Sequence, residues 1–165
     1  MILIYAFSNQ WGTNISRRTL LELQNIIKIS DIKFRLIRSY PQEFFRKYIQ
    51  GNKYDLIIGL GDSPSDKIRI ETQTKNSYND KSIYPFSPIL IDISIPLIEN
   101  YDSNYFAISS NMGTYNCNLI VYSTQLYLNQ KKLDTKHLFL HLPKKSNASF
   151  LANQIKNLIE LNNLI

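Results

Sequence analysis

One residue of this sequence can act as a strong nucleophile near neutral pH, and it is the single cysteine, Cys117. A small, polar stretch that contains a glycine, residues 109–116, leads into Cys117, and an apolar run that begins at Leu119 follows it. This pattern predicts a thiol at a helix start, where the helix dipole and unpaired backbone amides stabilise a thiolate and lower the pKa of the cysteine. A lone cysteine is more often a small buried side chain, so the nucleophile hypothesis depends on the residues that accompany it.

Two histidines are candidates for the base that a thiol nucleophile needs. His141 is the better placed, because it ends an apolar strand-like run, residues 136–141, at the edge where we expect the Cys117 loop. His137 begins the same run at the opposite edge. Glu71 is the candidate for a carboxylate that orients the base. Taken alone, His141 is more typical of a structural histidine, and Glu71 of a carboxylate on the solvent-facing side of a strand.

The elements that must position these residues follow from hydrophobic periodicity. Strand and helix patterns alternate through the first third of the chain, which predicts a three-layer α/β domain with parallel strands. Loops 8–13 and 60–65 should both leave the carboxyl edge, where such sheets bind ligands. The predicted strands are residues 2–7, 32–37, 54–59, 68–76 (more exposed), 105–108 and 136–141. The predicted helices begin at Asn14 or Ser16, at Pro41, at the Cys117 segment, and at Ser146 or Asn147.

Bulk properties indicate one globular domain, residues 1–165, with 44% hydrophobic and 19% charged residues. The net charge of +6 comes from basic residues scattered in ones and twos, so we expect no nucleic-acid partner. One cysteine permits no internal disulfide and offers too few ligands for a cysteine metal site, so neither a metal nor another cofactor is expected. The chain lacks a signal-like start and an apolar run of membrane-spanning length, which favours a cytoplasmic protein without a membrane partner.

Three segments, in this order, carry a family resemblance. Residues 109–118, Ser-Ser-Asn-Met-Gly-Thr-Tyr-Asn-Cys-Asn, with Tyr122 after them, resemble the nucleophile motif of the pyroglutamyl peptidase I family (pyrrolidone carboxyl peptidases). Residues 138–143 resemble its histidine motif, an apolar strand ending in His-x-Pro. Glu71, with Asn76 five residues on, resembles its acidic segment. Residues 2–14 and 54–61 are similar to the opening strand with its loop and to a later strand of that family.

The resemblance implies an α/β/α sandwich around a mostly parallel twisted sheet, and a cysteine peptidase that removes an N-terminal pyroglutamyl residue from peptides. Cys117 would be the nucleophile, His141 the base, and Glu71 the residue that orients His141. Backbone amides from Tyr115 to Cys117, including Asn116, would bind the oxyanion. The expected partner is a peptide or a small amide substrate.

Several positions depart from the family pattern. The family's Phe-x-Pro-Phe-Gly loop helps to enclose the pyroglutamyl ring. Here Phe7 persists, and Trp11 is the candidate for the second ring; Tyr115 is the third residue expected to bind substrate. Lys81 stands where the family has an arginine near the active site, and it keeps the charge without the planar fork. The chain is shorter than typical members around residues 82–105, near family subunit contacts, which leaves a homo-oligomer open.

Three functions therefore remain open. The first is a pyroglutamyl peptidase that acts through a thioester acyl-enzyme. The second is a relative whose triad serves another amide or acyl substrate, which the altered loop of residues 7–12 favours. The third is a binding protein on the same fold, without catalysis, whose basic surface engages an acidic partner or nucleic acid.

Overall fold

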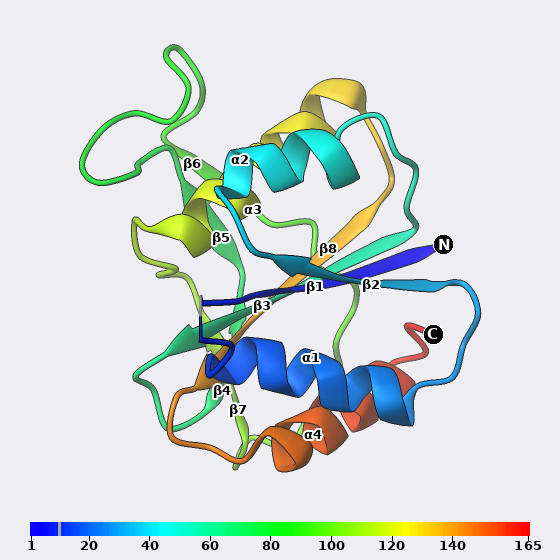
Figure 1. Ribbon diagram of the computed structural model, residues 1–165. Helices are drawn as coiled ribbons and strands as arrows, with labels where there is room; N and C mark the ends of the chain where they lie inside the picture. Colours follow the sequence, from blue (N-terminus) through cyan, green and yellow to red (C-terminus); the bar gives the residue numbers. More distant parts are fainter. Residues whose placement is uncertain (10) are drawn as a thin grey trace.

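A six-stranded sheet forms the centre of the protein, and the computed structural model describes residues 1–9 and 11–165. The strands lie in the order β2-β1-β3-β8-β4-β7 (Figure 1). The four strands from β2 to β8 run parallel to one another, whereas β4 runs antiparallel to β8 and parallel to β7. The strands span β1 Ile2–Phe7, β2 Ile32–Ile37, β3 Leu56–Ser63, β4 Ile68–Glu71, β7 Phe106–Ser109 and β8 Lys136–Pro143.

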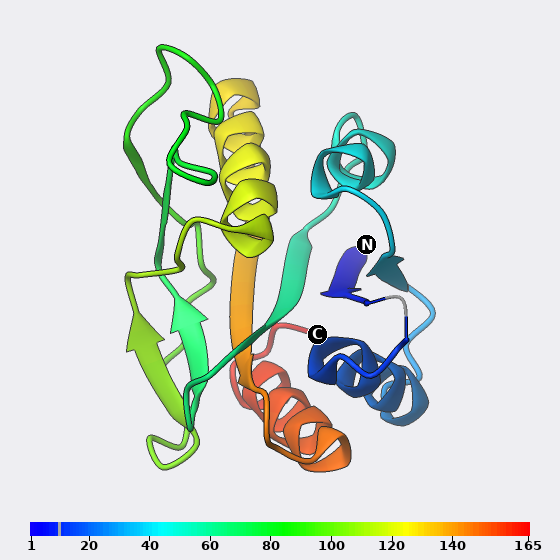
Figure 2. The same ribbon diagram turned by 60° about the vertical axis from the view of Figure 1, so that its left-hand side comes forward.

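Helices cover both faces of this sheet and make three layers, as Figures 1 and 2 show. The helices on one face are α1 (Ile15–Ile26) and α4 (Ala148–Leu161). The other face carries α2 (Pro41–Phe44), which continues into the π-helical turn η1 (Phe45–Ile49), and α3 (Asn116–Lys131). A small second sheet, β5 (Gln73–Lys75) with β6 (Leu90–Asp92), lies outside the main one and packs against α3. The predicted single-domain α/β fold with a mostly parallel sheet is confirmed.

Polar side chains cap two of the helices that the sequence predicts, α1 and α4. The Asn14 side chain accepts a hydrogen bond from Ser16 N at 2.8 Å and begins α1, and Asn147 accepts one from Phe150 N at 3.0 Å and begins α4. Pro41 occupies the first turn of α2, where its missing N–H costs no hydrogen bond.

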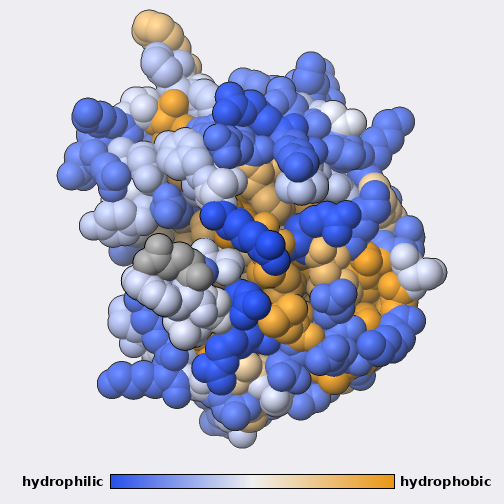
Figure 3. Space-filling view, in the orientation of Figure 1, coloured by the Kyte–Doolittle hydropathy of each residue, from blue (hydrophilic) through white to orange (hydrophobic). Residues whose placement is uncertain are grey.

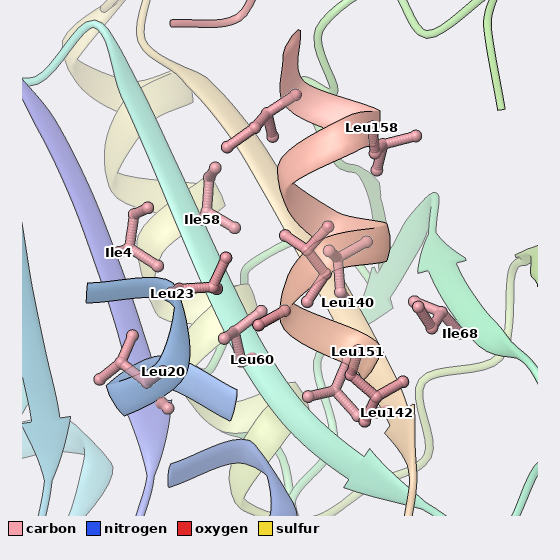
Figure 4. Close-up of a cluster of buried hydrophobic side chains, with 14 of the residues drawn as sticks. Ile4, Leu20, Leu23, Ile58, Leu60, Ile68, Leu140, Leu142, Leu151 and Leu158 are labelled. Carbon is pink, nitrogen blue, oxygen red and sulfur yellow. The ribbon is translucent and has the colours of Figure 1, made fainter. Parts of the chain in front are cut away.

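Strand alternation divides the core into two clusters. Even-numbered residues of β1, β3 and β8, such as Ile4, Ile58 and Leu140, face α1 and α4 (Figure 4). Odd-numbered residues, such as Tyr5 and Phe139, face α2 and α3. This period of two means that every second residue of a strand meets the same helical layer.

Two predicted elements differ from the observed ones. The predicted loop 60–65 is wrong for residues 60–63, because β3 continues to Ser63 and pairs with the end of β8. Residues 68–76 do not form one exposed strand, because β4 ends at Glu71 and β5 begins in the other sheet at Gln73. Neighbouring strands flank β4 on both sides, and its Glu71 is fully buried.

The irregular segments are held by side chains rather than by regular pairing. The Asn76 amide donates to the carbonyls of Tyr84 and Ser87, and its oxygen accepts from the backbone N–H groups of Ile83 and Tyr84.

In the space-filling view, the surface is mainly hydrophilic, with hydrophobic side chains gathered over the region of edge strand β2 (Figure 3). Among the described residues, no helix has the length and apolar character needed to cross a bilayer.

Candidate active site

The antiparallel pairing of β4 with β8 brings four side chains to one face of the sheet. Arg69 lies opposite His141, and Glu71 lies opposite Phe139. Because opposed residues and their neighbours two positions away share a face, Glu71 becomes the diagonal neighbour of His141. This is the face that α3 covers. Two adjacent strands therefore assemble the acid and the base without help from a loop.

Glu71 and His141 form the centre of the site. The His141 Nδ1 lies 2.7 Å from Glu71 Oε1, and both side chains are buried. An ionised carboxylate only accepts hydrogen bonds, so Nδ1 is the donor and Nε2 of the neutral ring is left as an acceptor. Burial raises the pKa of Glu71, but hydrogen bonds from His141 and Arg69 outweigh it and hold that pKa below its usual value. Glu71 is therefore ionised at neutral pH.

Cys117 is the second residue of α3, the helix that covers the face of the sheet on which this pair lies. It meets the pair at Gly61, which lies beside His141 in the register of β3 and β8. A Cβ on Gly61 would lie 2.8 Å from Cys117 Sγ and 3.0 Å from His141 Cδ2. The sulfur and the ring edge thus border the same small space, and the missing side chain of Gly61 makes room for both.

The resting thiol of Cys117 is protonated. Burial, followed by the carboxylates of Asp62 and Glu71, raises the pKa of Cys117 to about 12, while the helix backbone and Lys144 act in the opposite direction. The prediction that the helix start lowers this pKa is therefore wrong, because desolvation and nearby negative charge exceed the effect of the helix end. A thiolate at this position requires a proton acceptor close by.

The first turn of α3 is anchored by a side chain beside Cys117. The buried Asn118 amide donates to the carbonyls of Lys75 and Ser77, and its oxygen accepts from Thr74 Oγ1 and from Lys75 N. The residue that precedes the helix, Tyr115, makes no capping hydrogen bond with its side chain. Because backbone amides of a first helical turn lack intrahelical acceptors, those near Cys117 are the donors that an anion at this helix start would meet.

A cavity of about 320 Å³ opens onto the thiol and the imidazole, a volume within the range of small-molecule sites. Its lining combines charged and polar side chains with the apolar surface of Pro64, Met112 and Tyr115. The lining residues are Asp62, Ser63, Pro64, Arg69, Asn111, Met112, Gly113, Tyr115, Cys117 and His141.

The residues predicted for oxyanion stabilisation occupy different places. Tyr115 lines the cavity and is largely exposed. Asn116 is the first residue of α3, and its Oδ1 accepts a hydrogen bond from Tyr78 Oη at 3.1 Å. Lys81 is exposed in the 77–89 loop and lines a separate cavity beside Tyr40 and Tyr78. The structure thus brings Tyr115 and Asn116 to the thiol, and places Lys81 in the neighbouring cavity.

The two predicted ring-binding residues are also separated. Phe7 ends β1 and packs on the same hydrophobic cluster as Cys117. Trp11 is 76% exposed and lines another hollow with Arg17 and Arg38. Gln10, which lies between them in the predicted substrate loop, is outside the described residues.

Sequence reasoning missed two residues of the site, Arg69 and Gly61. Arg69 donates from Nε and Nη2 to Glu71 Oε1, at 2.9 and 2.5 Å. The signal for Arg69 was present, since residues 69 and 71 of one strand share a face and carry opposite charges. Gly61 gave no comparable signal, because the need for a missing Cβ arises only from two neighbours that are distant in sequence.

Within residues 1–9 and 11–165, no group of three or more His, Cys, Asp and Glu side chains is arranged to hold a metal ion. The sequence matches no protein-family model, and no curated protein matches it.

Solved structures do match, over nearly the whole chain. A mutant pyrrolidone carboxyl peptidase from the hyperthermophile Pyrococcus furiosus superposes with a TM-score of 0.81 at 20% identity, covering 99% of this chain and 98% of that one. The enzyme from Thermococcus litoralis gives 0.79 at 17% identity, covering 98% and 92%. The one from Fervidobacterium islandicum AW-1 gives 0.77 at 22% identity, covering 99% and 97%. The protein therefore has the fold of the pyrrolidone carboxyl peptidases.

Proposed function

We propose that this protein is a divergent pyroglutamyl peptidase, a cysteine peptidase that hydrolyses the amide bond after an N-terminal pyroglutamyl residue. The observation that carries the proposal is the buried hydrogen bond from His141 to Glu71, with Cys117 beside the same imidazole across Gly61. Nucleophile, base and orienting acid are the parts that acyl transfer by a thiol needs. The motif resemblance and the shared fold support the pyroglutamyl substrate.

In the first half of the reaction, the free Nε2 of His141 takes the proton from Cys117 as sulfur attacks the carbonyl carbon of the substrate. Glu71 stabilises the imidazolium that forms. This proton transfer matters because the resting thiol has a pKa of about 12 and carries no useful thiolate by itself. Backbone amides of the first turn of α3 receive the negative charge that develops on the carbonyl oxygen.

In the second half, His141 returns its proton to the leaving amine as the carbon–nitrogen bond breaks, and a thioester on Cys117 remains. His141 then accepts a proton from water, which attacks the thioester, and the proton passes to the departing sulfur. Pyroglutamate and the free thiol are released. Because the thiol must stay reduced through this cycle, we expect the protein to act in the cytoplasm.

The test is hydrolysis of a fluorogenic pyroglutamyl amide by the wild type and by Cys117→Ala and His141→Ala. Turnover should vanish in both variants, while Lys47→Ala, an exposed cation far from the cavity, should match the wild type. Wild-type turnover that survives both substitutions would refute the proposed mechanism.

A second candidate is the same chemistry on another amide or acyl group. The observation that favours it is the placement of Trp11, which lines a different hollow and not the cavity beside Cys117. In that case iodoacetamide should label Cys117 at neutral pH in a reaction that depends on His141, although pyroglutamyl amides are untouched. Slow labelling that is identical in His141→Ala would count against any catalytic thiol.

A further inference from the structure

A guanidinium lies within the proposed active site, and the chemistry described so far gives it no role. Arg69 lines the cavity together with Cys117 and His141, and its side chain is 27% exposed. Its three hydrogen bonds run to two different parts of the site. Two of them reach Glu71 Oε1, and the third, from Nη2, reaches the carbonyl oxygen of Asn111 at 2.7 Å.

The first target of Arg69 is the same oxygen atom that orients the base. Glu71 Oε1 accepts from His141 and from Arg69, whereas Oε2 is buried and accepts no hydrogen bond within the described part of the chain. The hydrogen bonds from His141 and Arg69 therefore hold the carboxylate through one oxygen, while the Ser109 side chain also helps to lower its pKa. Without the guanidinium, only His141 would hold Oε1.

The second target is the loop that leads to the nucleophile. Asn111 lies six residues before Cys117. Other hydrogen bonds tie this loop to the 75–79 segment, such as those from Lys75 Nζ to Asn111 Oδ1 and from Asn79 N to Thr114 O, whereas the bond from Arg69 ties it to the carboxylate of the site. A planar guanidinium can hold two acceptors at fixed relative positions, which a lysine ammonium on a flexible chain does poorly.

We infer that Arg69 is a positioning residue of this site: its guanidinium locks Glu71 Oε1 against His141 and fastens the same carboxylate to the loop that delivers Cys117. The acid on β4 and the nucleophile on α3 come from elements that meet only at the site. Arg69 sets the distance between them. The inference rests on the proposed function, since it assigns Arg69 a role in activating the same thiol.

The experiment measures the second-order rate of Cys117 alkylation by iodoacetamide, a reaction that needs no substrate. Arg69→Ala should alkylate about 10- to 100-fold more slowly than the wild type, the loss expected when reacting groups are displaced by about 1 Å. Millimolar guanidinium chloride should restore much of the rate, and an equal concentration of sodium chloride should not. Arg35→Ala, on the exposed strand β2, is the matched control and should behave as the wild type.

A purely structural role would give another pattern. The rate would then fall in parallel with the melting temperature, and guanidinium would not restore it. A folded Arg69→Ala variant that alkylates at the wild-type rate, or whose slow rate guanidinium leaves unchanged, overturns the inference. If Arg69→Ala does not fold, Arg69→Lys decides, because it keeps the charge but not the fork: a wild-type rate in that variant also overturns it.

This measurement separates the two proposals. A wild type that hydrolyses no pyroglutamyl amide would refute the proposed substrate, whereas the alkylation rates would still report whether Arg69 positions the thiol and its base.

Discussion

The two histidines of the protein lie four residues apart on the same face of β8, and α3 covers both of them. His141 donates to a carboxylate at 2.7 Å and borders a cavity. His137 is fully buried, with Nδ1 3.4 Å from the amide oxygen of Gln125, and its Nε2 has no hydrogen-bond partner among the described residues. Burial lowers the pKa of His137 to about 3.

This difference shows how little separates the environment of the proposed base, His141, from that of a structural histidine. The same strand face and the same helix supply both, yet only one end has a negative charge to stabilise an imidazolium. At the other end, Gln125 also accepts from Ser94 N and Ser94 Oγ, so its oxygen is shared in a neutral network. His137 stays uncharged and inaccessible, whereas the ring of His141 is hydrogen-bonded to a carboxylate and borders the cavity.

The largest effect on activity should come from replacing each of the two histidines separately. We expect His141→Asn to lower kcat/KM for a pyroglutamyl amide by about 10³- to 10⁴-fold, because the general base is removed. His137→Asn, assayed at a temperature where it is folded, should keep kcat/KM near the wild-type value. Equal losses in the two folded variants would mean that the comparison has no bearing on catalysis.

Glu71→Gln makes the partner of His141 resemble that of His137. The amide cannot stabilise the imidazolium and can favour the wrong tautomer, so we expect kcat to fall by about 10²- to 10³-fold. Steady-state kinetics on protein whose fold is verified by circular dichroism would measure this, with Glu43→Gln on the surface as control. Unchanged kcat would show that the hydrogen bond to Glu71 is dispensable.

Gly61→Ala tests the space shared by sulfur and imidazole. The added methyl group would lie within 3.0 Å of both, so one must move, and we expect kcat/KM to fall by about 10- to 100-fold. Gly59→Ala is the companion variant, because its methyl group would meet Phe139 and Tyr5 rather than the catalytic pair. It should reduce the melting temperature more than Gly61→Ala does. The reverse ranking would contradict the assigned roles.

The smallest effect concerns stability rather than turnover. Burial lowers the pKa of His137 to about 3. Between about pH 3 and about pH 6.5, this histidine is therefore protonated in the unfolded chain but not in the folded chain. Stability is therefore complete above about pH 6.5 and decreases as the pH falls, by at most about 1.4 kcal/mol per pH unit. Urea unfolding between pH 5 and 7 should show a flatter dependence in His137→Asn. An unaltered slope would show that His137 is protonated in the folded state.

Much of this arrangement could be predicted from the sequence. The motif around Cys117 and the apolar strand that ends at His141 each indicate a candidate residue, and the structure places the two side chains around the same space. The alternation of strands and helices predicts the fold class. The burial of Glu71 could not be predicted in this way, because a polar residue at alternate positions normally marks a solvent-facing side. Its charge is instead neutralised inside the protein by Arg69 and His141.

The direction of β4 and the positions of the loop side chains could not be predicted from the sequence either. Local residues determine that 68–71 is a strand, but the choice of an antiparallel neighbour depends on β7 and β8, which follow much later. Trp11 and Lys81 lie in segments without periodicity, so nothing in the local pattern indicates the direction of their side chains.

The antiparallel insertion of β4 has a consequence for the cooperativity of the site. Only three residue pairs join β4 to β8, and a slip by one residue would turn Arg69 and Glu71 towards the apolar layer under α1 and α4. Burying two charged side chains in that apolar layer would cost more free energy than the remaining hydrogen bonds between β4 and β8 could supply. A shifted register is therefore too unstable to be populated. The strand is either paired with β8, with Glu71 and His141 aligned, or detached from the sheet. The catalytic geometry should be gained and lost in a single step.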